Sequence, residues 1–372
     1  MKKRNAVRAL LAALPCALFA AGFETKGNVT LGVTPVARAG AEAEFGGAYL
    51  LGNIAVSNER LTAAGKIYYR LGATDDIETL SQKIDVKRAF VRFRPFGNGA
   101  LEFSGGKLYS YYLSGNYFQL AEIYTGASRW GKTGVGARAR VSGLTLGLAL
   151  PLSESYAAFS EEFALNAAAE FDFSSVAESV PLTAGASLLY GWTKGADDEH
   201  DFQKTVSLTC APAIDGFISL LSLTLSYTHN AEPFVANATY KNVANCGRPD
   251  LKKAQFASLT FRAHLGEVQL LAEGEAGRSI GGELVPLYAA AQALVPVAAH
   301  VALKPRVCYY AALDTDDGDM SRHAFEFYPR AWLTFARWTV SAGVDLGWKQ
   351  AAPDDWQLEW SLPLYVEYKI GK

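Results

Sequence analysis

The chain has 372 residues, of which 50% are hydrophobic, 12% aromatic and 19% charged, and its formal net charge is −2. This slightly acidic balance argues against nucleic acid as a general partner, because phosphate binding needs a basic surface. Mean hydropathy is only +0.05. After the N-terminal segment, no uninterrupted apolar run reaches the ~18 residues that a spanning helix requires. These values argue against a helical membrane protein.

The first predicted element is a secretory signal at residues 1–21. Basic residues precede an apolar run, and small residues stand near position 21, where a signal peptidase would cut. The basic residues are Lys2, Lys3, Arg4 and Arg8. Removing these four charges from a chain of net charge −2 leaves the mature chain, residues 22–372, near −6.

The mature chain reads as strands of about 10 to 12 residues in which apolar and polar side chains alternate. In the stretch KIDVKRAFVRFRP, residues 83–95, Ala89, Val91 and Phe93 share one face. Near the C-terminus, WQLEWSLPLYVEYKIG has an aromatic residue near both ends of its apolar row, which is typical of a lipid-facing strand with two interfacial girdles. Other strands, which alternate with varying clarity, are predicted at 61–72, 84–94, 99–108, 132–141, 163–173, 217–229, 253–264 and 323–335.

Connector lengths give a second test of the fold, because outer-membrane barrels alternate short turns with long loops. Short connectors are predicted at 57–60, 95–98, 142–143, 174–180, 212–216, 265–266, 295–299 and 336–337. Longer polar or glycine-rich stretches, such as 109–131 and 230–252, fall between them. The pattern predicts an all-β, transmembrane, antiparallel up-and-down β-barrel of about 16 to 18 strands. A soluble β-sandwich or solenoid is the alternative, but each strand offers only one apolar row.

The alternation also predicts which charged residues line the lumen. A cationic side chain on the lipid face would cost ~2 to 4 kcal/mol near the midplane, so we expect a basic wall on the inside of the barrel. Its members are Lys66, Arg70, Arg88, Arg92, Arg94, Lys132, Arg138 and Arg140. The acidic lumen candidates are Glu102, Glu122, Glu267, Glu273 and Glu275, with Glu326 and Asp345 on later strands.

Basic rows favour anions in a pore, whereas opposed rows of charge would give a transverse field with no strong ion preference. A third interpretation is that the arginines form local ion pairs with Glu102 and with loop carboxylates. In that case they only make the wall of the pore rigid.

The stretch from VKRAFVRFRP through GNGALEFSGGK and the following loop to GVGARARV resembles the Gram-negative porin superfamily. An arginine-bearing strand, a tight turn, a strand ending near GGK and a long third external loop follow one another as in those porins. The resemblance implies that this loop, 109–131, folds into the barrel and narrows it opposite the basic wall. Porins of this kind usually end in Phe and form trimers, whereas this chain ends in KIGK. The aromatic residues of the loop are Tyr109, Tyr111, Tyr112, Tyr117, Phe118 and Tyr124.

The sequence therefore predicts an outer-membrane porin of a diderm bacterium, which passes small hydrophilic solutes with a mild preference for anions. Its expected partners are outer-membrane lipid, those solutes and, by resemblance, two further copies in a homotrimer. One alternative is a sugar- or solute-specific channel that uses the loop aromatics. Another is an adhesin or receptor that binds through the loop 230–250 without transport.

No enzymatic activity, cofactor or metal is expected. A phospholipase-type barrel would need an outward-facing Ser and His, but His264 is predicted to face inward, and no GxSxG motif occurs. The five His are scattered and no CxxC pair is present. Outside the signal, the odd number of cysteines (Cys210, Cys246 and Cys308) leaves disulfide pairing open.

Overall fold

The structure is a computed structural model that describes residues 23–38, 43–72, 81–107, 133–151, 162–193, 201–210, 217–229, 253–279, 284–314, 320–352 and 355–371. The described residues form 24 strands, all in one antiparallel sheet, and one short 3-10 turn at Phe173–Ser175. Within this part of the chain, no helix is both long enough and apolar enough to cross a membrane. The predicted signal peptide and the loop 109–131 lie outside the described residues, so both stay predictions.

The strands of the first half of the chain are β1 (Glu24–Thr34), β2 (Ala37–Arg38), β3 (Ala43–Glu44), β4 (Gly47–Ser57), β5 (Leu61–Gly72), β6 (Ser81–Phe93), β7 (Leu101–Lys107), β8 (Thr133–Val141), β9 (Leu144–Pro151), β10 (Glu162–Asp172), β11 (Leu182–Thr193) and β12 (Asp201–Cys210).

Those of the second half are β13 (Ile218–His229), β14 (Lys253–Leu265), β15 (Val268–Ser279), β16 (Leu284–Ala298), β17 (Val301–Leu303), β18 (Arg306–Asp314), β19 (Met320–Tyr328), β20 (Arg330–Phe335), β21 (Trp338–Gly343), β22 (Asp345–Ala352), β23 (Asp355–Ser361) and β24 (Leu364–Ile370).

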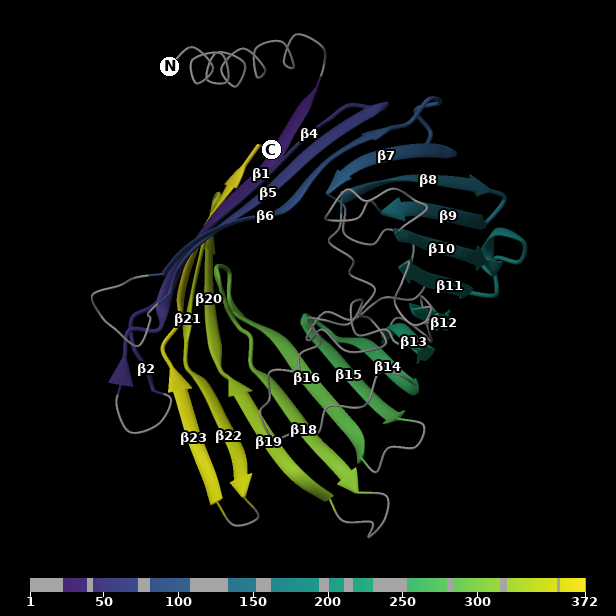
Figure 1. The fold of residues 1–372 in the computed structure, drawn as a ribbon. Coiled ribbons are helices and arrows are strands. Elements are labelled where there is room, and N and C mark those ends of the chain that lie inside the picture. The colour runs from purple at the N-terminus through teal and green to yellow at the C-terminus, as the bar shows by residue number, and fades with distance from the viewer. Residues whose placement is uncertain are drawn as a thin grey trace.

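The sheet closes on itself. Consecutive strands that are separated by only one or two residues either pair as antiparallel hairpins or run on in the same direction. Six pairs run on in the same direction as single passages, so the 24 strands make 18 passages, the upper end of the predicted range. Each passage pairs with the one before it and the one after it, and β24 returns to pair with β1 from Gly27↔Ile370 to Val33↔Leu364. Figure 1 shows β24 alongside β1, with the other strands arranged around a common axis. The predicted barrel is therefore confirmed.

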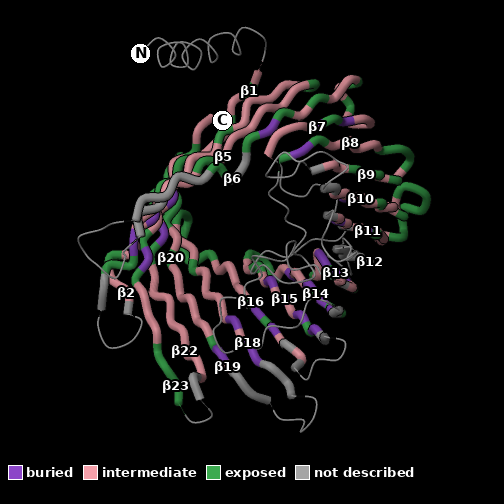
Figure 2. The backbone as a smooth tube through the Cα atoms, in the orientation of Figure 1, coloured by how far each residue is buried: buried purple, intermediate pink, exposed green. Residues whose placement is uncertain are grey.

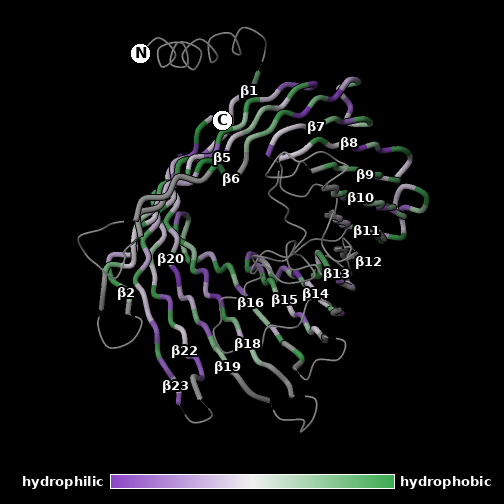
Figure 3. Tube along the Cα trace, in the orientation of Figure 1, coloured by the Kyte–Doolittle hydropathy of each residue, from purple (hydrophilic) through white to green (hydrophobic). Residues whose placement is uncertain are grey.

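Apolar and polar side chains alternate along these strands, but here the apolar ones are exposed and the polar ones are buried, the reverse of a soluble protein. On β13, Leu221, Leu223 and Leu225 are 39%, 42% and 50% exposed, whereas the intervening Ser222 and Thr224 are each 2% exposed. Side chains on the concave face of a closed sheet crowd together, so the less exposed, polar face is the inner one. Residues 255–260 of β14 also alternate between exposed and buried, and Figures 2 and 3 show exposure and hydropathy changing along the strands. A continuous apolar outer face requires lipid, and a closed sheet leaves no unpaired edge in it.

Short turns gather at one edge of the barrel, here called the short-turn edge. They span 58–60, 94–100, 142–143, 173–181, 266–267, 299–300 and 336–337, close to the predicted connectors. Between β8 and β9, Ser142 and Gly143 both have positive φ, 45° and 83°, as a two-residue hairpin turn requires. A Cβ atom at Gly143 would also meet Ser175 Oγ at 1.9 Å. Both the positive φ and the lack of space therefore favour glycine at this position.

Six adjacent passages are interrupted at the same level of the sheet. The breaks at 304–305, 329, 344, 362–363, 35–36 and 45–46 face one another in the strand register. Four of them contain proline, which has no N–H to give to the ladder: Pro35, Pro305, Pro329 and Pro363. Backbone bonds across the line remain, such as Lys304 N to Arg330 O at 2.7 Å. Breaks of this kind bend a strand and re-aim its side chains.

Candidate functional site

Three arginines of the first half of the barrel converge on one carboxylate. Arg92 lies on β6, Arg94 directly follows that strand, Glu102 is the second residue of β7, and Arg138 lies on β8 opposite Glu102. Their apolar neighbours Val91, Phe93 and Phe103 are 49%, 47% and 46% exposed on the outer face. Alternation therefore sends the arginines and Glu102 to the inside, near the short-turn edge. This set of four residues is called the arginine cluster below.

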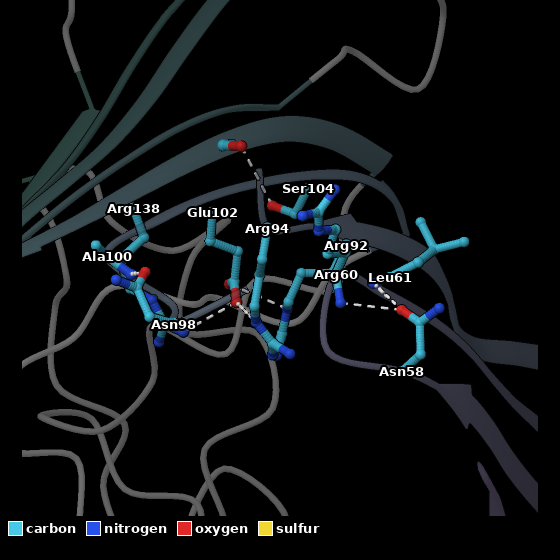
Figure 4. A network of polar contacts seen from close by, with 11 residues as sticks. Asn58, Arg60, Leu61, Arg92, Arg94, Asn98, Ala100, Glu102, Ser104 and Arg138 are labelled. Atoms are coloured by element: carbon cyan, nitrogen blue, oxygen red, sulfur yellow. Dashed lines mark hydrogen bonds and ion pairs between the residues drawn. The ribbon is translucent and has the colours of Figure 1, made fainter. Parts of the chain in front are cut away.

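The contacts in the arginine cluster are short and involve both carboxylate oxygens (Figure 4). Arg92 Nε lies 3.0 Å from Oε1 of Glu102, while Arg94 Nε and Arg138 Nη2 lie 2.9 and 3.2 Å from Oε2. Glu102 is 1% exposed, whereas the arginines are 18 to 25% exposed. The carboxylate is thus enclosed by guanidinium groups that still reach solvent at their outer sides.

Ordered turns hold the strands of this cluster in place. The side chain of Asn58 accepts hydrogen bonds from the backbone N–H groups of Arg60 and Leu61 at 2.9 and 2.7 Å. Asn98 accepts one from Ala100 at 3.0 Å in the next turn. Arg94 N in turn donates to Arg60 O at 2.7 Å, which ties the two turns together. Such side-chain-to-backbone bonds are the usual reason for Asn in tight turns.

The arginine cluster carries a surplus of positive charge. Three guanidinium groups and one carboxylate give these four residues a formal net charge of +2. The interpretation of local pairing with Glu102 thus agrees with the contacts of these three arginines, while the loop carboxylates that it also invokes lie outside the described residues.

A second group of inward-facing residues spans the closure of the barrel, with members on β4 and β5 on one side and on β20 and β24 on the other, and sequence reasoning missed it. Ring centroids of Tyr49 and Tyr68 are 5.3 Å apart, and those of Tyr49 and Tyr365 are 6.0 Å apart. The guanidinium carbon of Arg330 lies 4.9 Å from the Tyr365 ring and 5.9 Å from the Tyr328 ring. We call this series, completed by Arg306, the tyrosine arc.

Arg306 covers the other end of the arc, with its guanidinium carbon 4.1 Å from the Tyr328 ring. Arg330 donates to both carboxylate oxygens of Asp345, at 2.7 and 2.8 Å, and Tyr328 donates its hydroxyl hydrogen to Glu326. Glu326 and Asp345 therefore act as partners of the arc and not as a separate acidic wall. Next to the arc, Lys304 Nζ lies 4.6 Å from the Trp332 ring.

The line of backbone breaks positions this arc. Arg306 and Arg330 each follow a proline, in the sequences LKPRV and FYPRA, and Tyr365 lies two residues after Pro363. The only sequence signal for the arc was this repeated Pro-Arg pair at the middle of an alternating stretch. This Pro-Arg pair does not indicate which aromatic rings the arginines contact, because Arg306, Arg330 and Tyr365 come from three different passages.

The remaining predicted residues fall into three groups. Lys66 lies on β5 opposite Asn53, and Arg140 on β8 opposite Thr145, both on inward positions by alternation. In the backbone register Arg88 lies opposite Lys66 and Arg70 opposite Tyr49, while the side chains of both are outside the described part of the structure. The loop predictions are wholly outside it: Lys132, Glu122, Tyr109, Tyr111, Tyr112, Tyr117, Phe118 and Tyr124.

The three carboxylates predicted on one later strand do not stay together. Glu273 and Glu275 lie on the inner face of β15, each only 4% exposed, so they are not presented as an open acidic surface. Glu267 is predicted on the same strand, but the structure places it in the turn before β15. Gly266, with φ 61°, takes the preceding turn position and moves Glu267 out of the strand.

An aromatic group occupies the outer face near the opposite edge. Tyr309 Oη and His323 Nδ1 are 2.7 Å apart, and His323 stacks on Trp356 at 6.3 Å between centroids. Trp356 is 50% exposed. Amphipathic rings of this kind lie at the headgroup level of transmembrane barrels, so the group has the position of an interfacial girdle.

The fold and these inner-face residues define the class: a closed, lipid-facing antiparallel β-barrel of 18 passages. No protein-family model matches the sequence, and no curated protein matches it. Among solved structures, the chain is similar to OpdK of Pseudomonas aeruginosa with vanillate, at a TM-score of 0.57 and 11% identity over 95% of this chain and 99% of that one.

OccK1 (OpdK) of the same organism gives a TM-score of 0.56 at 12% identity, again over 95% and 99% of the two chains. The outer-membrane channel DcaP of Acinetobacter baumannii gives 0.45 at 12% identity over 94% and 97%. The chain thus has the fold of outer-membrane β-barrels such as OpdK.

Proposed function

We propose that the protein is an outer-membrane porin, a passive channel for small hydrophilic solutes with a mild preference for anions. The observation that carries the preference is the arginine cluster, whose net charge of +2 lies on the inner face of a closed barrel. Barrels of 16 to 18 strands are wide enough to enclose an aqueous channel. Fixed charge on the wall of such a channel raises the local concentration of counter-ions.

The proposal includes an outer-membrane location, transport without catalysis, and the homotrimer usual for the porins that the sequence resembles. The barrel fold supports the location, since its apolar outer face needs lipid. The low exposure of Glu273 and Glu275 favours an anion preference over a pore with balanced, opposed charges. OpdK was solved with vanillate, so we include vanillate among the test anions.

The test is the current through single channels of the refolded mature protein in a planar bilayer. We expect stepwise conductance. In a salt gradient, we expect the reversal potential to be shifted toward the equilibrium potential of chloride. Replacing Arg92, Arg94, Arg138 and Glu102 together by Gln removes the surplus charge without leaving a buried carboxylate alone. The reversal potential of this variant should move toward that of the cation.

A charge-balanced control is available in the same barrel. Arg330→Gln combined with Asp345→Asn removes one charge of each sign and should leave the reversal potential close to that of the natural sequence. A protein that forms no conducting steps would contradict the porin proposal. An unchanged reversal potential in the neutralised arginine cluster would contradict the origin of the anion preference.

A further inference from the structure

The tyrosine arc has a surface chemistry that the anion preference does not use. Its own charged groups are equal in number, since the two guanidinium groups of Arg306 and Arg330 are accompanied by the two carboxylates of Glu326 and Asp345; Lys304 lies beside the arc, against the Trp332 ring. The arc also adds aromatic rings to the inner wall: the Tyr49 ring lies 5.3 and 6.0 Å from those of Tyr68 and Tyr365, and Arg330 contacts both Tyr365 and Tyr328. An anion gains little from such a surface, whereas an uncharged solute with flat apolar faces gains contact area.

The arc is accessible as well as continuous. Tyr49, Tyr68, Tyr328 and Tyr365 are all of intermediate exposure, on inward positions of their strands. Tyr310, by contrast, is only 1% exposed. Its hydroxyl donates to Glu326 at 3.4 Å, so Tyr310 helps to position that carboxylate and is not itself open to a solute. The four half-buried rings thus form the part of the wall that a solute can touch.

Gly32 makes the arc continuous across the closure of the barrel. It lies on β1 between Tyr49 of β4 and Tyr365 of β24, directly paired with both. A Cβ atom at Gly32 would meet the Tyr49 ring at 2.3 Å and the Tyr365 ring at 2.9 Å. The missing side chain therefore leaves the space in which the two rings approach each other.

We infer that the tyrosine arc is a binding site for uncharged ring-shaped polyols, that is, for sugars. The faces of a sugar ring are lined by C–H groups that pack on aromatic rings, while its edge hydroxyls need both donors and acceptors. The arc offers both: the guanidinium N–H groups of Arg306 and Arg330, the tyrosine hydroxyls, and the carboxylate oxygens of Asp345 and Glu326. The inference rests on the proposed porin function, because the solute must enter the lumen to reach the arc.

The experiment measures the interruption of ionic current by added solutes in the refolded full-length mature protein. Glucose and maltose are the ring-shaped probes. Sorbitol is the matched control, because it has the hydroxyls of glucose but no closed ring with apolar faces. We expect concentration-dependent blockade by the two sugars, with maltose acting at the lower concentration, and none by sorbitol. Benzoate tests a charged ring and should block more weakly than maltose.

Substitutions on one strand separate stacking from other effects. Tyr365→Leu removes a ring of the arc and should raise the half-blocking maltose concentration about five-fold, the effect of losing one stacking contact. Tyr365→Phe keeps the ring and should stay within about two-fold of the natural sequence. Tyr368→Leu, three residues along β24 on the outer face, should leave the blockade unchanged.

Each other outcome overturns the inference. Equal blockade by sorbitol, stronger blockade by benzoate than by maltose, or an equal loss in the Phe and Leu variants would show that ring stacking does not hold the solute. If Tyr365→Leu does not fold, Tyr68→Leu at the other end of the arc provides the same test. A channel that conducts with anion preference but shows no sugar blockade would contradict this inference alone. A barrel that conducts no ions would contradict the porin proposal itself.

Discussion

The arginine cluster and the tyrosine arc lie on the same inner face, but their arginine side chains contact different kinds of groups. In the arginine cluster, three guanidinium groups share one carboxylate, and two positive charges remain. In the tyrosine arc, the guanidinium groups lie against aromatic rings and are matched by as many carboxylates. Among the described residues, guanidinium groups therefore outnumber carboxylates in the arginine cluster, whereas the two are equal in number in the tyrosine arc.

The two regions also differ in how far apart their residues are in the chain. The arginine cluster uses β6, β7 and β8, which follow one another, so it needs only two local strand pairings. The tyrosine arc joins Tyr49 and Tyr68 to Tyr328 and Tyr365, which are 260 to 316 residues away in the chain. It exists only when β24 pairs with β1, so it reports closure of the barrel, whereas the arginine cluster does not.

The largest effect is expected for Glu102→Gln. This change removes the carboxylate that the three guanidinium groups share, and breaking a buried ion pair from one side costs about 3 kcal/mol. We expect the free energy of unfolding, measured by denaturant titration in lipid vesicles, to fall by about that amount. Folded channels should show a stronger anion preference. A free energy unchanged within error would mean that the carboxylate does not hold the cluster together.

A smaller effect is expected for Asp345→Asn in the tyrosine arc. Arg330 loses a bidentate partner but keeps its contacts with two aromatic rings, and both members of the pair are 22 to 23% exposed. The free energy of unfolding should fall by about 1 kcal/mol, less than for Glu102→Gln. The arc also gains one positive charge, so the reversal potential should move toward chloride. A loss equal to that of Glu102→Gln would remove the distinction between the two regions.

The smallest effect is expected for Gly32→Ala, which tests the closure directly. The added methyl group must push the rings of Tyr49 and Tyr365 apart, and overpacking of this size costs about 1 kcal/mol or less where side chains can shift. Gly52→Ala on β4 is the matched control, since a Cβ atom there meets nothing within 4 Å. Equal melting temperatures for the two variants would show that the rings do not meet across β1.

Much of the fold could be predicted from local pattern, because inward and outward positions alternate with a period of two. Short connectors revealed where strands reverse, and the positions of Glu102 and Arg138 on facing strands followed from that count. The error at Glu267 came from a shift of one residue in a turn, which sequence pattern resolves poorly. Tyr49 and Tyr365 were each predictable as inward residues, but nothing local indicates that their rings lie 6.0 Å apart.

Alternation along a strand is a property of neighbouring residues, so the printed sequence already contains the barrel, its lipid-facing side and the basic character of β6 to β8. Contacts between distant strands depend on the number of passages and on the register in which the last strand meets the first. Gly32 illustrates this point, since its small size matters only because β4 and β24 flank it in the closed sheet. The tyrosine arc is therefore a product of closure, which brings together side chains that no local spacing relates.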